Sequence, residues 1–112
     1  MKSRLYIATP INARKEPTKK ERFLAAKHLC ELIKEVLSDE PWYQDYDEVI
    51  TPFDVNPFGK YGETEAMGRC VTAVLESSAI YLDHGWQSSK GCNLEYRTAK
   101  LYDKVIYEHD KL

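Results

Sequence analysis

Residues 85–100, GWQSSKGCNLEYRTAK, combine a helix start suited to an anion with a nearby carboxylate. Ser88 or Ser89 is a good helix N-cap, which leaves the following amides as donors at the positive end of the helix dipole. Such a helix start, next to Lys90, can bind a phosphate. Many helices begin this way without binding anything, so the interpretation as an anion site depends on where this helix lies in the fold.

Glu95 lies about two helical turns beyond this start. It shares one helical face with Cys92, Ala99 and Tyr102, at i−3, i+4 and i+7. The carboxylate is therefore directed toward packed structure, where a partly buried acid needs a partner or a chemical role. Two plain alternatives are a salt bridge to Arg97 or Lys100, or a position on the exposed surface of the helix.

Four short runs rich in Val, Ile and Tyr predict β-strands. They are RLYIAT (4–9), EVITPF (48–53), SAIYLD (78–83) and KVIYEH (104–109). Three helical patterns alternate with these runs, and the last of them, from about 89 to 102, carries Glu95.

The first helix is predicted to begin at a T-x-x-E capping box, formed by Thr18 and Glu21, and to end near Ser38. Its apolar face consists of Ala26, Leu29, Cys30, Ile33 and Leu37. The second is predicted from about 63 to 77. Its inward residues are Ala66, Met67, Cys70, Val74 and Leu75.

Strands that alternate with helices form a parallel sheet with helices on both faces, because the crossovers are right-handed. We expect a three-layer, flavodoxin/Rossmann-like α/β sandwich with four to five parallel strands in the order 2-1-3-4. In such a sheet the ligand crevice opens at the carboxyl ends of the first and third strands. The side chains expected there, besides the start of the last helix, are Thr9, Pro10, Asp83, His84 and Trp86.

The composition predicts one soluble globular domain over residues 1–112. A net charge of −2, with both signs interleaved, offers no broad positive field for a nucleic acid polymer. No apolar stretch is long enough to span a membrane, and the N-terminus lacks the centre of a signal peptide, so we expect a cytoplasmic protein. Cys30, Cys70 and Cys92 lack CxxC spacing and are interpreted as packed, reduced thiols, with a redox or metal role as the alternative.

Three features together resemble the nucleoside 2-deoxyribosyltransferase-like superfamily, and in particular its small DUF4406-like branch with a Gly-Trp turn. They are a strand with LYIATP, a later strand ending in a GW turn, and S-x-G-x-x-x-E at Ser89, Gly91 and Glu95. The resemblance covers most of the chain. It implies that Glu95 is a nucleophile that attacks the anomeric carbon of a sugar, and that Tyr6 orients this carboxylate. It also implies that Ser89 binds the 5′ end of the substrate, where nucleotide-hydrolysing members hold a phosphate.

The sequence departs from the family pattern at the residue that protonates the leaving base. Cys70 stands where the transferases have an Asp, and a thiol is a poor substitute for a carboxylic acid. Asp83 or His84 is the proposed replacement. The family also completes each site with an Asn from a neighbouring subunit, for which this sequence offers no obvious counterpart.

Three functional hypotheses follow. The first is an N-glycosidase or deoxyribosyltransferase that acts on a nucleoside or nucleoside 5′-monophosphate and needs no metal or cofactor. The second is a non-catalytic module that binds a nucleotide or phosphosugar in the same pocket. The third is a subunit of a larger assembly that makes contact through Trp42, Tyr43 and Tyr46, although such a cluster also packs on its own domain. By resemblance, a homo-oligomer is expected.

Overall fold

The fold is built on a parallel four-stranded sheet. The computed structural model describes residues 3–10, 19–57 and 60–111. The strands are β1 (Arg4–Ala8), β2 (Glu48–Ile50), β3 (Ala79–Leu82) and β4 (Val105–Glu108). They lie in the order β2-β1-β3-β4, and every neighbouring pair is parallel. The predicted α/β class and strand order are therefore confirmed, with four strands in the described part of the chain.

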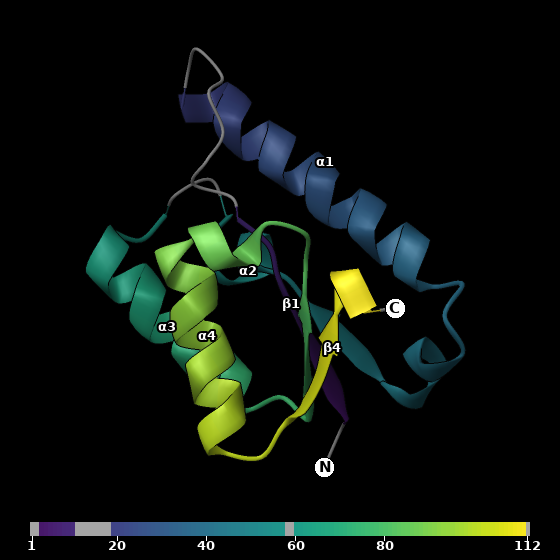
Figure 1. Ribbon diagram of the computed structural model, residues 1–112. Coiled ribbons are helices and arrows are strands. Elements are labelled where there is room, and N and C mark those ends of the chain that lie inside the picture. Colours follow the sequence, from purple (N-terminus) through teal and green to yellow (C-terminus); the bar gives the residue numbers. More distant parts are fainter. Residues whose placement is uncertain (1–2, 11–18, 58–59, 112) are drawn as a thin grey trace.

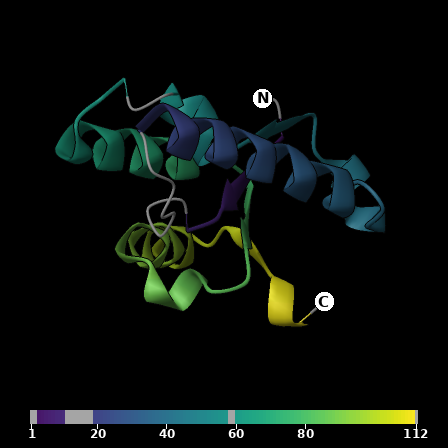
Figure 2. The ribbon, with the colours of Figure 1, turned by 90° about the horizontal axis from the view of Figure 1, so that it is seen from above.

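Helices cover both faces of this sheet, as the right-handed crossovers require. They are α1 (Lys19–Leu37), α2 (Pro52–Val55), α3 (Glu63–Leu75) and α4 (Lys90–Leu101), with 3-10 turns η1 (Pro41–Asp45), η3 (Trp86–Ser88) and η4 (His109–Lys111). In Figures 1 and 2, α3 and α4 lie together on one side of the sheet, whereas the C-terminal part of α1 lies on the other. The end of α1 agrees with the prediction, while Thr18 of the predicted capping box lies outside the described residues.

The alternation of side chains along β1 divides the core into two halves. Leu5 and Ile7 pack with α1, whereas Tyr6 and Ala8 pack with α3 and α4. The apolar face predicted for α1 is buried, with Leu29 only partly so. On α3 the prediction for Leu75 is wrong, because that side chain is 38% exposed and Ala73 is buried instead. Ala73 and Val74 lie three and four residues after Cys70, at helical spacing.

The predicted strand 48–53 is shorter than expected, because its second half starts a helix. Thr51 caps α2: its hydroxyl oxygen accepts from the amide of Asp54, and the Asp54 carboxylate accepts from the amide of Thr51. Pro52 occupies the first helical turn, which favours this arrangement. The peptide from Pro52 to Val55 therefore belongs to α2, where it contributes to the pocket described below.

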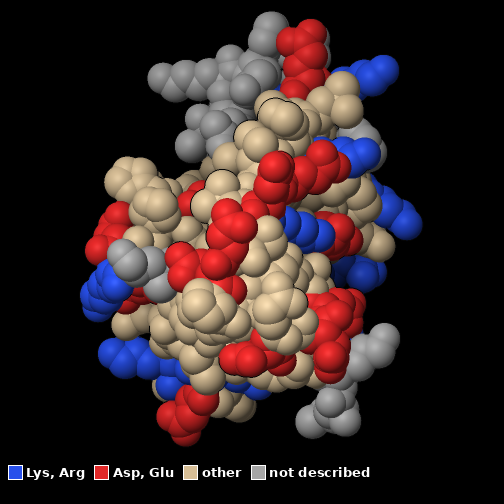
Figure 3. All heavy atoms as spheres, turned by 90° about the vertical axis from the view of Figure 1, so that its right-hand side faces the viewer, with Lys and Arg blue, Asp and Glu red and all other residues tan. Residues whose placement is uncertain are grey.

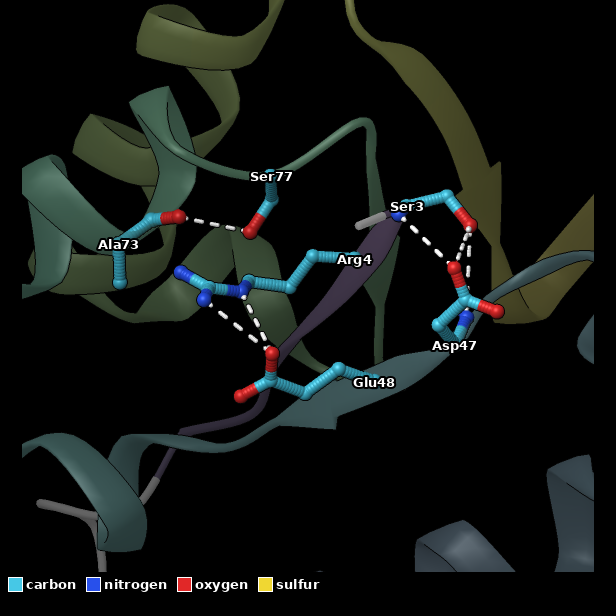
Figure 4. A network of polar contacts seen from close by, with 6 residues as sticks. All are labelled: Ser3, Arg4, Asp47, Glu48, Ala73 and Ser77. Atoms are coloured by element: carbon cyan, nitrogen blue, oxygen red, sulfur yellow. Dashed lines mark hydrogen bonds and ion pairs between the residues drawn. The ribbon is translucent and has the colours of Figure 1, made fainter. Parts of the chain in front are cut away.

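At the amino ends of β1 and β2, polar side chains pair with one another (Figure 4). Arg4 and Glu48 are register partners, and their guanidinium and carboxylate lie 3.1 Å apart. The backbone amide of Ser3 donates to Asp47 at 3.3 Å, and the hydroxyl of Ser77 donates to the carbonyl of Ala73 at 2.6 Å. The Arg4–Glu48 and Ser3–Asp47 contacts thus join β1 to β2 at the amino ends of the strands, whereas the Ser77 bond lies at the end of α3.

On the side that Figure 3 shows, acidic and basic side chains are interspersed around uncharged surface. This face offers no broad basic field for a polyanion. Within the described residues, no helix is long and apolar enough to cross a lipid bilayer.

Candidate functional site

A pocket of about 100 Å³ opens beside the carboxyl end of β1, which points toward the top of Figure 1. Residues from α1, α2, α3 and α4 and the peptide after β1 enclose it. The lining residues are Thr9, Phe23, Ala26, Pro52, Phe53, Asn56, Ala66, Met67, Cys70, Ser89, Gly91, Cys92 and Glu95. The pocket lies where the topology of a parallel sheet predicts a ligand crevice.

Glu95 is the one carboxylate that lines this pocket among the described residues, and it is only 3% exposed. The hydroxyl of Tyr6, which is fully buried in β1, donates a hydrogen bond to Oε2 of Glu95. The thiol of Cys70 on α3 is a second hydrogen-bond partner of the carboxylate. Glu95 therefore meets two neutral donors from neighbouring elements, whereas the alternative interpretation paired it with Arg97 or Lys100.

Burial sets the protonation of this group. Desolvation by burial raises the pKa of Glu95, and hydrogen bonds from Tyr6 and Cys70 lower it. Burial is the larger effect, and the resulting pKa is about 7. Burial and the nearby carboxylate raise the pKa of Tyr6 well above its usual range and that of Cys70 to about 11. Near neutral pH, Glu95 can therefore exchange its proton while Tyr6 and Cys70 keep theirs. A carboxyl with such a pKa can act as a nucleophile or as an acid or base.

The start of α4 forms another part of the pocket wall. Ser89 is the N-cap, and its hydroxyl accepts from the amide of Cys92 at 3.2 Å. Gly91 has no side chain, so space remains between α4 and Met67. A methyl group added at Gly91 would lie 3.6 Å from Sδ of Met67. Lys90 and Ser88 line a different hollow, so neither belongs to this pocket. Ser88 instead donates to the carbonyl of Gly85 at 2.8 Å.

The turns after β1 and β3 are joined by a hydrogen bond. The hydroxyl of Thr9, which lines the pocket, donates to Oδ2 of Asp83 at 2.8 Å. Pro10 follows Thr9 and is half-buried. Asp83 thus positions the peptide after β1 and does not itself line the pocket.

Two other predicted site residues lie outside the pocket lining. His84 is exposed, and its Nδ1 lies 3.2 Å from Asp110. Trp86 is buried and packs on the ring of Tyr96, with centroids 4.8 Å apart. Gly85 between them has φ of 81°, a left-handed conformation that favours glycine and explains the Gly-Trp turn. None of the predicted residues at this turn lines the pocket.

Tyr102 does not share the buried face of Glu95, so that prediction is wrong. It is the C-cap of α4, with φ −105° and ψ 19°, and its side chain is 63% exposed. The face ends at Ala99, which is fully buried together with Cys92.

Sequence reasoning missed part of the pocket wall. Phe53 and Asn56, on and just after α2, line the pocket, as does Phe23 of α1. The sequence does contain a signal for α2, because Thr51 and Asp54 flank Pro52 and form a capping box. The apolar run of 48–53 was interpreted as a strand, so this capping box was overlooked. No local signal marks Phe23 as a pocket residue, because its position depends on the packing of α1 against the other helices.

Comparison with known proteins assigns the chain to a family. A family model described as "Domain of unknown function (DUF4406)" matches residues 3–108. No curated protein matches the chain, and no solved structure does. Since the match extends over nearly all of the 112 residues, this protein belongs to the DUF4406 family.

Proposed function

We propose that this protein cleaves or transfers the N-glycosidic bond of a nucleoside or nucleoside 5′-monophosphate, with Glu95 as the nucleophile. The observation that supports this proposal most directly is the buried carboxylate of Glu95, which Tyr6 holds at the wall of the pocket. Among the described residues no cationic side chain pairs with this carboxylate. Burying an unpaired carboxyl is costly, which supports a chemical role for Glu95.

The chemistry proceeds in two displacements. Ionised Glu95 attacks the anomeric carbon and a sugar ester forms. The base leaves with the electrons of the glycosidic bond and takes a proton from solvent water. Water or a second base then attacks the same carbon, which releases the sugar with overall retention and restores the carboxylate. Tyr6 keeps its proton and holds Oε2 in place, so the other oxygen of Glu95 is the candidate attacking atom.

The pocket is small, which limits what it can enclose. A volume of about 100 Å³ is below the roughly 300–1,000 Å³ typical of sites for drug-sized ligands. We therefore assign the pocket to the sugar, with the base extending beyond it. The 5′ group would face the amides at the start of α4, beside Ser89 and Gly91, where a helix terminus favours an anion.

A base-release assay tests this proposal. Deoxynucleosides and their 5′-monophosphates are incubated with the wild type and Glu95→Gln, and free base is measured by chromatography. The proposal predicts release by the wild type and a loss of at least about 10³-fold in the variant, as for removal of a nucleophile. Glu48→Gln, which changes a partly exposed glutamate at the amino end of β2, is the matched control and keeps its activity. Equal release by the wild type and Glu95→Gln would refute the enzymatic proposal.

A second candidate function is a binding module without turnover. Cys70 motivates it, because burial raises the pKa of the thiol to about 11 and so makes it a poor acid for the leaving base. Calorimetry with deoxynucleoside monophosphates separates the two functions. Binding of a ligand that is recovered unchanged after long incubation supports the module, whereas absence of binding argues against both.

The aromatic cluster on which the assembly hypothesis rested packs within the chain and so gives no separate reason to expect a partner, and that hypothesis stays a prediction. The rings of Trp42 and Tyr107 stack with centroids 3.8 Å apart, and the hydroxyls of Tyr46 and Tyr107 lie 2.8 Å apart. Homo-oligomerisation and a cytoplasmic location stay predictions, the first of which light scattering can test.

A further inference from the structure

The turns at the carboxyl ends of β3 and β4 bring two histidines and an aspartate together. β3 and β4 are parallel neighbours with Leu82 opposite Glu108, so the residues that follow them meet at one corner of the sheet. His84 comes from the first turn, and His109 and Asp110 come from η4. One ligand atom from each of the three lies within 4.8 Å of the other two. We propose that His84, His109 and Asp110 bind a divalent transition metal, with Zn²⁺ as the best match to their chemistry.

The spacing of the donor atoms suits a shared ion. Nδ1 of His84 and Oδ1 of Asp110 are 3.2 Å apart. Two ligands at the zinc distances of about 2.0–2.2 Å in a tetrahedral site lie roughly 3.4 Å from each other. The ring of His109 lies across from that of His84, with centroids 5.7 Å apart. All three side chains are exposed, so small rotations about their χ angles bring the third donor to the same ion.

A contact behind His109 orients its ring toward this corner. Nδ1 of His109 lies 3.0 Å from the hydroxyl of Tyr81, whose side chain is buried in β3. With Nδ1 engaged there, Nε2 is the atom left to bind a metal. Metal-binding histidines are commonly held in this way, by a hydrogen bond from the nitrogen that does not bind the ion. The contact with Tyr81 thus leaves the second nitrogen of His109 free to bind an ion.

The electrostatic surroundings also favour a dication. Asp83 lines the same hollow as His109, and Asp110 adds a second carboxylate at this corner. The nearest basic residue in sequence, Lys111, pairs with Glu108 at 3.3 Å. A bound Zn²⁺ would relieve the repulsion among these carboxylates.

This metal site is separate from the pocket that Glu95 lines, since none of its three residues belongs to the pocket lining. Two imidazoles and one carboxylate leave a fourth tetrahedral position for water. The ion would connect the turn after β3 to the segment after the edge strand β4. It would therefore stabilise this corner of the sheet whether or not the glycosidase proposal holds.

The test is calorimetric titration of tag-free, reduced protein with ZnCl₂. The variants are His84→Gln and His109→Gln, with His28→Gln as the matched control, because the chain has three histidines and His28 is an exposed residue of α1. We expect one ion per chain in the wild type and control, and an affinity at least about tenfold weaker in each cluster variant. Far-UV circular dichroism checks that every variant is folded. No binding, or equal affinity in all four proteins, would overturn the proposal.

Titration with Co²⁺ gives an independent readout of the ligands. The proposed site predicts visible absorption typical of nitrogen and oxygen ligands, lost in the two cluster variants. A thiolate-to-cobalt charge-transfer band would instead assign the binding to the cysteines and contradict the proposal. Zn²⁺ should also raise the melting temperature of the wild type and His28→Gln but not of His84→Gln or His109→Gln.

Discussion

Two glutamates form hydrogen bonds with side chains of β1, and their carboxylates lie in different surroundings. At the amino end, Glu48 is 39% exposed and meets the guanidinium of Arg4 at 3.1 Å. At the carboxyl side, Glu95 is buried, and its described partners are the neutral hydroxyl of Tyr6 and the neutral thiol of Cys70. Solvent and a cation stabilise the first carboxylate, whereas the second has two hydrogen bonds and little solvent.

The amino end of the sheet is joined by a charge pair, whereas the carboxylate near the carboxyl end is suited to chemistry. The Arg4–Glu48 pair joins register partners of β1 and β2, a role that requires only a stable pair of charges. Glu95 is held at a pKa of about 7, which costs stability whenever the group is ionised. A protein tolerates such a cost where an ionisable group has a chemical role.

The largest expected effect on stability is that of Glu95→Gln at alkaline pH. The folded-state pKa of Glu95 is raised from 4.5 to about 7, so its contribution to stability is fully present below pH 4.5 and is lost as pH rises through 7. The glutamine side chain of the variant does not ionise, so the variant keeps its stability as the pH rises. At pH 8 it should be more stable than the wild type by about 3 kcal/mol, at 1.36 kcal/mol per pKa unit, and nearly equal at pH 4. Urea unfolding at both pH values measures this, and equal stabilities at pH 8 would contradict the burial of an ionised Glu95.

Tyr6→Phe should have a smaller effect on stability and a distinct effect on the pH dependence. The variant removes a hydrogen bond that lowers the pKa of Glu95, so the pKa should rise further. Stability at pH 8 should fall by about 1–3 kcal/mol, because a buried carboxylate loses a donor. If Glu95 is the nucleophile, kcat increases with pH through about 7 in the wild type, with a higher midpoint in the variant.

Tyr107→Phe is the control for that change. It removes one partner of the Tyr46–Tyr107 hydroxyl pair on the opposite face of the sheet. It should cost about 1 kcal/mol and leave the pH midpoint unchanged. An equal shift of the midpoint in both variants would show that the effect of Tyr6 is not specific to Glu95.

Gly91→Ala should separate ligand binding from stability. The added methyl would make ordinary contact with Met67 and would narrow the pocket without strain. Helix stability should change by less than about 1 kcal/mol, in the stabilising direction. Affinity for a pocket ligand should fall at least several-fold by calorimetry. Gly68→Ala on α3, where an added methyl meets nothing within 4 Å, is the matched control, and a similar loss there would argue against this pocket.

The smallest expected effect is that of Glu48→Gln, and its sign is opposite to that of Glu95→Gln. The pair with Arg4 is partly exposed, and such pairs contribute about 0.2–1 kcal/mol. Removing the charge should therefore lower stability by about 0.5 kcal/mol at pH 8 and low salt, and less at 1 M salt. A stabilisation like that expected for Glu95→Gln would remove the distinction between the two carboxylates.

Features with strong local signals could be predicted from the sequence. The alternation of strands and helices predicted the parallel sheet and its order. An N-cap at Ser88 or Ser89 was predictable because capping depends on neighbouring residues, and the N-cap is Ser89. Placing Glu95 inward followed from helical spacing with Cys92 and Ala99, all three of which are buried.

Features that depend on tertiary packing escaped prediction. The apolar run of 48–53 favoured a strand although Thr51 begins α2. His84 was expected at the crevice, yet it lies beside Asp110, because the contact between the turns after β3 and β4 is set by strand pairing across a long sequence separation. Phe23 reaches the pocket through the packing of α1, which no local pattern specifies.

The proposed mechanism requires a covalent bond between Glu95 and the sugar, which mass spectrometry can detect. The wild type and Glu95→Gln are incubated with a deoxynucleoside 5′-monophosphate, quenched in acid, and measured intact and after digestion. If Glu95 is the nucleophile, we expect a mass increase of one sugar phosphate on the peptide that contains Glu95, and no increase in the variant. Base release without any adduct on that peptide, or an adduct on Cys70 instead, would contradict it.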